Sequence, residues 1–191
     1  MSATGPALVL GSTQDPAVVD ARVAAAAGVD VVRRRSGGGA VLVGPGEAVW
    51  VDVFVPADDH RWHRDVGRAT HWLGEAWASA LARLGLHATV HRGRLVATEW
   101  SRLACFAGLG PGELLLGGKK VVGISQHRAR AGALFQCAAL LRWEPAALVG
   151  LLALDPAARA RAAAALAGVA APVAVSPECL VDALLASLSA A

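Results

Sequence analysis

The segment from residue 113 to residue 125 constrains the fold most strongly, because it predicts a tight hairpin. Two apolar runs, at residues 113–116 and 120–125, are separated by Gly117-Gly118 and one lysine. A two-residue hairpin turn needs backbone conformations with positive φ, which glycine adopts at little cost. Strands joined by so short a turn pair in the antiparallel direction. The sheet of this protein is therefore expected to be antiparallel at least in part.

Further strands are predicted on both sides of this hairpin. Apolar or alternating runs bounded by turn residues place them at residues 7–10, 29–34, 40–43, 48–55, 87–91, 95–97 and 133–141. Gly44-Pro45-Gly46 is a strong turn signal between two of these strands, and the glycine-rich stretch at residues 36–39 separates two others.

Helices are predicted before, between and after the strands. Asp15-Pro16, an N-cap followed by a first-turn proline, opens a helix to about residue 27. The clearest helix spans residues 66–84. Its apolar residues recur on one stripe: Val66, Ala69, Leu73, Trp77, Ala80 and Leu84. The last fifty residues are expected to be helical, with cap-plus-proline starts at Asp155-Pro156 and Ser176-Pro177. Together these elements predict an α+β fold with a mixed, largely antiparallel sheet flanked by helices.

Charge and composition exclude several classes of protein. The 18 basic and 15 acidic residues give a net charge of +3, which is too small to argue for nucleic acid as a partner. No run is long and apolar enough to cross a membrane, and the N-terminus lacks the features of a signal peptide. Three cysteines without a CxxC pair favour a reducing compartment. A cytoplasmic protein is expected. Because no repeat or long linker divides residues 1–191, they are expected to form one domain.

Common nucleotide and metal motifs are not satisfied. Gly118-Lys119 does not belong to a P-loop, because Glu113 stands where the first glycine should be and a strand follows the lysine. The glycines at 37–39 do not form a dinucleotide fingerprint, because Leu42 stands where its third glycine should be. His60 and His63 lack a cysteine or acidic pair that would complete a metal site, so no metal ligand is predicted.

The two lysines are the first functional signal. Sixteen of the 18 basic residues are arginine, and the only lysines, Lys119 and Lys120, stand side by side. Arginine cannot replace lysine where a compact point charge is needed. The pair is therefore a candidate for a functional amine at the hairpin.

A second cationic segment, residues 33–41, places three arginines before Ser36 and the three glycines. Successive glycines allow backbone N–H groups to approach an anion closely, and arginine makes two-pronged contacts with phosphate or carboxylate. Strand alternation makes it unreasonable to expect all three arginines to point inward. If the two segments face each other, they suit a nucleotide phosphate together with the carboxylate of an acid.

These two segments resemble the signature pair of lipoate protein ligases, R-R-x-S-G-G-G-A-V followed by G-K-K-[hydrophobic]-x-G-x-x-Q. Their order and separation match, and the similarity covers roughly residues 8–142, including a G-x-x-Q turn at residues 11–14. The resemblance implies the fold shared with biotin protein ligases and class II aminoacyl-tRNA synthetases.

The resemblance also implies roles for individual residues. Lys120 is separated from the motif glycine, Gly123, by two residues, Val121 and Val122. By the resemblance it would be the catalytic lysine that contacts the carboxyl oxygen of the acid and the α-phosphate. The expected substrate- and nucleotide-binding residues are Arg33, Arg34, Ser36, Gly37, Gly38, Gly39, Ala40, Gly123, Ser125, Gln126 and Arg128.

The activity implied by the resemblance is ATP-dependent lipoylation. ATP with Mg²⁺ would convert lipoate, octanoate or a related acid such as biotin into an acyl-adenylate, and a lysine of a lipoyl or biotinyl carrier domain would then accept the acyl group. The residues do not choose between these acids. A separate accessory subunit is a further expected partner, because the accessory C-terminal domain of many ligases has no counterpart in these 191 residues.

Cys105-Phe106 leaves an alternative open. Octanoyltransferases of the same superfamily carry a C-F dipeptide upstream of the lysine hairpin, and this resemblance makes Cys105 a candidate nucleophile that takes an acyl chain without ATP or another cofactor. A thiol beside a lysine can be activated as a thiolate. Two other interpretations are a small buried core thiol and a non-catalytic binding relative.

Overall fold

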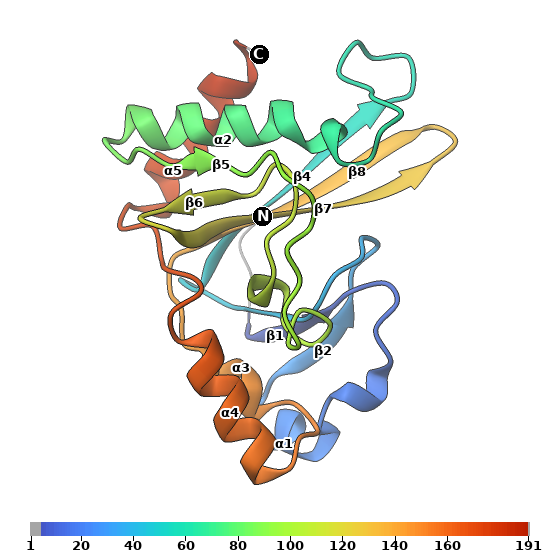
Figure 1. The fold of residues 1–191 in the computed structure, drawn as a ribbon, viewed down its shortest axis with the longest axis vertical. Helices are drawn as coiled ribbons and strands as arrows, with labels where there is room; N and C mark the ends of the chain where they lie inside the picture. Colours follow the sequence, from blue (N-terminus) through green and yellow to red (C-terminus); the bar gives the residue numbers. More distant parts are fainter. Residues whose placement is uncertain (1–4, 191) are drawn as a thin grey trace.

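Two β-sheets organise the chain in the computed structural model, which describes residues 5–190 (Figure 1). The larger sheet has the strand order β4-β8-β7-β6-β5, and the smaller has the order β2-β1-β3. In the larger sheet β4 is Ala48–Pro56, β5 is Thr89–Val90, β6 is Leu114–Leu116, β7 is Lys119–Ala129 and β8 is Gly132–Leu140. In the smaller sheet β1 is Ala7–Leu10, β2 is Asp30–Arg33 and β3 is Val41–Val43.

The predicted hairpin is present and belongs to the larger sheet. Gly117 and Gly118 turn β6 into β7 with φ angles of 57° and 79°, as a two-residue turn requires. Every strand pair in this sheet is antiparallel. In the smaller sheet β1 is parallel to β2 and antiparallel to β3. The expected α+β class with a mixed, largely antiparallel arrangement is confirmed, and the strands divide between two sheets.

Helices α2 (His71–Arg83) and α5 (Pro177–Leu188) pack on each other and on one face of the larger sheet (Figure 1). Leu73 and Trp77 are fully buried there against Phe135 of β8. Burial of such side chains contributes about 1.5–3 kcal/mol each to folding. The predicted stripe is correct from Ala69 onward. Val66 is 58 % exposed, because the chain first forms the 3-10 turn Arg68–Thr70 and α2 begins only at His71.

A second core forms at the opposite end of the molecule, where α1 (Ala21–Ala26), α3 (Pro145–Gly150) and α4 (Pro156–Leu166) pack around the smaller sheet (Figure 1). Its buried side chains include Leu8 and Leu10 of β1 together with Leu152 and Leu166. Asp155 and Ser176 cap α4 and α5 as predicted, with proline in the first turn of each helix.

Two of the predicted elements differ in the structure. The helix expected from Asp15 to residue 27 is interrupted, because Val19 is extended and pairs with Leu152, and Asp20 caps a new helix. Tertiary pairing of a β-branched residue outweighs helix continuation here. The strand expected at residues 95–97 is an exposed loop that makes one isolated bridge, between Val96 and Leu109.

The loop at residues 36–39 joins β2 to β3 and lies against both the larger sheet and the segment at residues 103–105. Ala40 donates to the Leu103 carbonyl and accepts from Cys105 N. A Cβ at Gly39 would stand 2.6 Å from the Ala104 carbonyl carbon and 2.8 Å from Cys105 N. Only glycine allows this close approach of two backbones. At Gly37 an added Cβ would meet no atom within 4 Å.

These two glycines give a matched pair of variants. Gly39→Ala should cost about 1–3 kcal/mol, the range for overpacking a close contact, and should lower the melting temperature by several degrees. Gly37→Ala should stay within about 0.5 kcal/mol of wild type, because its φ is not positive and the space is open. Thermal unfolding followed by circular dichroism checks both, and equal melting temperatures would contradict the packing described here.

Candidate functional site

Lys120 is buried near the start of β7, and all the donor capacity of its ammonium group is used. Its Nζ donates to the Cys105 carbonyl at 3.0 Å and to the Gly108 carbonyl at 2.9 Å, and it forms an ion pair with Glu113 Oε2 at 2.7 Å. The side chain is 3 % exposed. Because a lysine ammonium has three N–H bonds, these three oxygens satisfy it completely.

Glu113 is the acidic partner in this cluster, and it was not among the predicted site residues. Its carboxylate accepts from Gly110 N at 2.6 Å and from Ile124 N at 3.1 Å, besides pairing with Lys120. Its side chain is 6 % exposed. The carboxylate therefore fixes the 108–113 loop to β7 as well as balancing the charge of the lysine.

Two neighbours shape the space around the Lys120 side chain. The ring centroid of Phe106 lies 4.9 Å from Nζ, a distance at which an ammonium group is attracted to an aromatic face. A Cβ at Gly123 would stand 3.4 Å from Lys120 Cε and from Phe106 Cζ. The glycine of the motif thus leaves room for the lysine stem and the ring together.

Arg34 organises the glycine-rich loop from inside. Its guanidinium donates to the carbonyls of Val9, Gly37 and Gly39 and to Ser36 Oγ. Burial lowers the pKa of Arg34, and the neighbouring Cys105 thiol opposes that shift. Arg34 therefore holds the loop in shape, while the predicted neighbour Arg35 is exposed.

A buried polar network joins the loop to the larger sheet. Ser36 is fully buried, and its Oγ lies 2.7 Å from Ser125 Oγ and 2.9 Å from Gln136 Oε1. Ser36 N also donates to Gln136 Oε1, and the amide of Gln136 donates to Asp52. Ser36 and Ser125, predicted from separate motifs, are in contact. Gln136 and Asp52 belong to no motif. In the sequence, the one feature that could have drawn attention to them is that each is a polar residue in an otherwise apolar strand.

Cys105 lies between the lysine cluster and the glycine-rich loop. It is half-buried, and a Cβ at Gly38 would stand 3.8 Å from its Sγ. Cys137, by contrast, is fully buried on β8, where burial raises its pKa to about 12. A thiol so hard to ionise is a core residue. Cys105 is thus the cysteine that the structure brings to the predicted site.

Three predicted residues are directed elsewhere. Arg33 donates to the carbonyls of the early turn at residues 11–14, which it stabilises. Gln126 donates to the Val66 carbonyl, and Arg128 donates to the carbonyls of residues 63 and 64. Side chains alternate along a strand, so Gln126 and Arg128 lie on the opposite face of β7 from Ser125. Gln126 and Arg128 therefore hold residues 63–66 against β7 and do not take part in the polar network around the glycine-rich loop.

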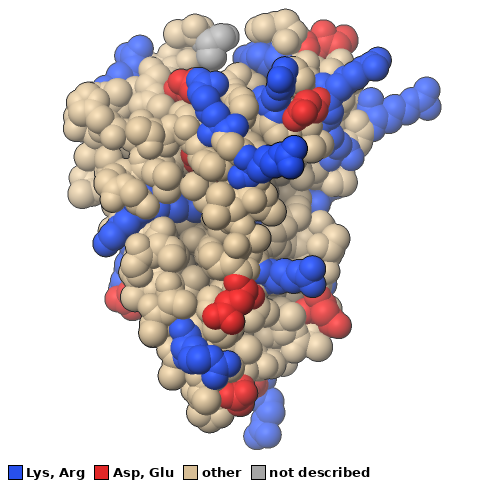
Figure 2. All heavy atoms as spheres, in the orientation of Figure 1, with Lys and Arg blue, Asp and Glu red and all other residues tan. Residues whose placement is uncertain are grey.

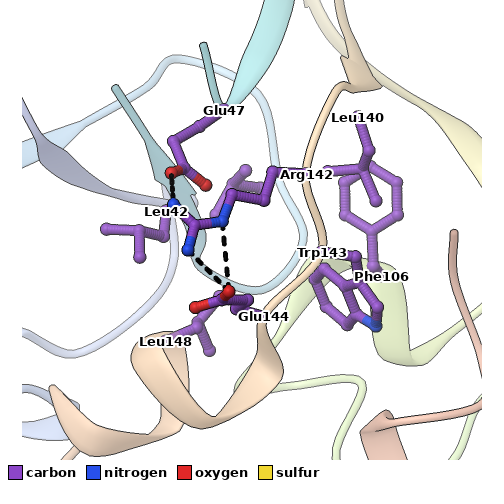
Figure 3. A pocket seen from close by; sticks show the side chains of 9 residues that line it. Leu42, Glu47, Phe106, Leu140, Arg142, Trp143, Glu144 and Leu148 are labelled. Atoms are coloured by element: carbon purple, nitrogen blue, oxygen red, sulfur yellow. Dashed lines mark hydrogen bonds and ion pairs between the residues drawn. The ribbon is translucent and has the colours of Figure 1, made fainter. Parts of the chain in front are cut away.

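Two hollows border the cluster. An open groove of about 450 Å³ runs beside Gly38, with Thr13, Asp15, Ser101 and Arg102 among its lining residues. A much smaller pocket, of about 20 Å³, lies behind Phe106, whose ring stands 5.7 Å from that of Trp143. Figure 3 shows Arg142 between Glu47 and Glu144 beside this pocket.

Charged side chains of both signs lie near the start of α2. Arg68 and Arg92 are exposed, and Arg92 pairs with Glu75. Burial together with the charges of Arg92 and Arg68 lowers the pKa of His71, and the charges of Asp65 and Glu75 oppose that shift. Lys and Arg side chains predominate over the upper part of the face in Figure 2. Within residues 5–190, no three His, Cys, Asp or Glu side chains are grouped to hold a metal ion, and no helix is long and apolar enough to cross a membrane.

Several solved structures that share this fold are lipoate ligases. The chain has a TM-score of 0.78 with a chain from the bipartite lipoate protein ligase system of Thermoplasma acidophilum, at 22 % identity over 97 % of this chain and 67 % of that one. It has a TM-score of 0.68 with an ATP-bound lipoate-protein ligase A, at 21 % identity over 97 % and 68 %. With P. falciparum LipL1 in complex with lipoate the TM-score is 0.63, at 14 % identity over 97 % and 44 %.

The sequence itself carries the family signature. No curated protein is significantly similar to the chain. Residues 3–182, almost the whole length, match the lipoyl protein ligase A/B catalytic domain. The fold, the lysine hairpin and the glycine-rich loop agree with this match, and the chain belongs to the lipoyl protein ligase A/B catalytic domain family.

Proposed function

We propose that the protein activates lipoate or a closely related carboxylic acid with ATP and transfers it to a lysine of a carrier protein domain. The observation that carries this proposal is the position of Lys120, which is buried among oxygen acceptors next to the glycine-rich loop. A carboxylate is a poor acyl donor, so ATP converts it to an acyl-adenylate and releases pyrophosphate. The carrier lysine then displaces AMP and forms an amide.

The residues of the site suit the charges of this reaction. In residues 5–190 the N–H groups of Gly37, Gly38 and Gly39 donate to no protein acceptor, so they are free for the oxygens of a phosphate or carboxylate. Lys120 supplies a fixed positive charge where negative charge develops at the carboxyl oxygen and the α-phosphorus. Mg²⁺ would enter with the nucleotide, bound by its phosphates.

Proteins of the same fold support the choice of substrates. One is bound to ATP, another to lipoate, and the T. acidophilum system includes an E2 lipoyl domain. We therefore assign lipoate as the first acid to test and a lipoyl domain as the first carrier.

The two adjacent lysines provide the test of this function. Lys120→Ala should reduce lipoate-dependent exchange of labelled pyrophosphate into ATP by about 10²–10³-fold, the usual effect of removing one charge-stabilising donor. Lys119→Ala should change the rate less than about twofold, because Lys119 is exposed at the turn. If Lys120→Ala retains pyrophosphate exchange, the assignment of the site is wrong. If the wild-type protein shows no exchange with any acid, the proposed ligase function is wrong.

A second candidate function rests on Cys105, whose half-buried thiol lies beside Arg34 and whose carbonyl binds Lys120. In this reaction the Cys105 thiolate attacks an acyl thioester on a carrier protein and releases the thiol of that carrier. The amine of a carrier-domain lysine then attacks the enzyme thioester, forms the amide and returns the cysteine.

The second candidate predicts a covalent intermediate. Incubation with an octanoyl thioester of an acyl carrier protein should add one octanoyl group to the wild-type chain, measured by intact mass. The adduct should persist in Cys179→Ser, which removes an exposed cysteine on α5, and should vanish in Cys105→Ser. If the wild-type chain stays unmodified, the transferase function is excluded.

A further inference from the structure

We propose that Glu113 is a positioning residue that holds Lys120 in place and competes with the carboxylate of the substrate for it. The inference rests on the proposed function, in which Lys120 binds the acid. It concerns a residue that was not among the predicted site residues. If it is correct, Glu113 determines how tightly the acid binds and how well the lysine is aligned for the reaction.

The first step of the argument is the number of hydrogen bonds. The ammonium group of Lys120 has three N–H bonds, and the carbonyls of Cys105 and Gly108 and the carboxylate of Glu113 accept all of them at 2.7–3.0 Å. No donor is left for another oxygen. An acid that binds Lys120 must therefore take the place of at least one of these three acceptors.

The second step is that Glu113 is held in its position. Gly110 N and Ile124 N donate to its two carboxylate oxygens, and the side chain is 6 % exposed. The two carbonyls belong to Cys105, the first residue of the short 3-10 turn Cys105–Ala107, and to Gly108, which follows the turn. Whichever acceptor the acid displaces, the negative charge of Glu113 remains close to the substrate carboxylate.

The third step is the charge balance. In the structure Lys120 and Glu113 form a neutral pair that is almost completely buried. Adding a second carboxylate leaves one uncompensated negative charge in a region where charges are weakly screened, which is unfavourable. Arg34 is not arranged to form a two-pronged pair with this carboxylate, because four of its five N–H groups are directed at three carbonyls and Ser36. Neutralising Glu113 should therefore strengthen acid binding.

The same change should impair the reaction. An amide at position 113 offers one acceptor oxygen where the carboxylate offers two, so Gly110 N, Ile124 N and Lys120 Nζ can no longer all be satisfied as they are now. The Lys120 side chain is then held less firmly in the position needed for the reaction. The variant Glu113→Gln is therefore expected to lower both KM for the acid and kcat. If Glu113 had a purely structural role, Glu113→Gln would raise KM or reduce activity, and the effect would not depend on whether the ligand is charged.

The experiment compares lipoate with lipoamide, which has the same tail and no charge. Isothermal titration calorimetry should show lipoate binding about tenfold tighter to Glu113→Gln than to wild type, equivalent to about 1.4 kcal/mol. Binding of lipoamide should change less than about twofold. Pyrophosphate exchange should show the paired fall in KM and kcat. Glu75→Gln is the matched control, because Glu75 is an exposed glutamate that pairs with Arg92 on the surface.

An unchanged or weaker affinity for lipoate relative to lipoamide in Glu113→Gln would overturn the proposal. If that variant does not fold, Glu113→Asp keeps the charge and withdraws it from Lys120, so the preference for lipoate over lipoamide should rise by a smaller factor. No rise would again overturn it. A wild-type chain that neither binds an acid nor exchanges pyrophosphate would refute the proposed function together with this inference. A failure confined to the variants leaves the proposed function standing.

Discussion

The ion pair between Lys120 and Glu113 is the interaction on which the rest of the site depends. It joins β7 to the segment at residues 105–113, and that segment also packs against the glycine-rich loop through Ala40 and Gly39. Burying two charges is costly unless their hydrogen bonds are complete, and here backbone N–H and C=O groups complete them. Removing one partner would therefore disturb three segments that are distant in the sequence.

The glycine-rich loop supplies the second half of the site because two sheets meet there. Arg34 fixes the loop from the side of the smaller sheet, and Ser36 fixes it to β7 and β8 through Ser125 and Gln136. Within residues 5–190 the backbone N–H groups of these glycines have no protein acceptor. This arrangement explains the glycine at position 39, since a larger residue there would meet the backbone of Ala104.

The sequence allowed the fold class and the main hairpin to be predicted, because each depends on local chemistry, and its motifs made Lys120 and Ser36 candidates for the site. Gly117-Gly118 requires a particular turn, and Lys120 and Ser36 belong to specific motifs. The partners Glu113, Gln136 and Asp52 could not be predicted, because strand pairing alone brings them to the site. Local signals also failed at Val19, because its pairing with Leu152 interrupts the predicted helix. They failed at Gln126 and Arg128 too, because the motif does not show which face of the strand these side chains occupy.

The two-lysine composition permits a direct measurement of the buried ammonium group. In protein labelled with ¹⁵N-lysine, only two side-chain amine signals exist, and Lys119→Arg leaves one. Because three hydrogen bonds and burial protect Lys120, its amine signal should remain visible at a pH and temperature at which exchange with water removes that of exposed Lys119. If both amines exchange as rapidly as free lysine in the substrate-free protein, the buried cluster described here is wrong.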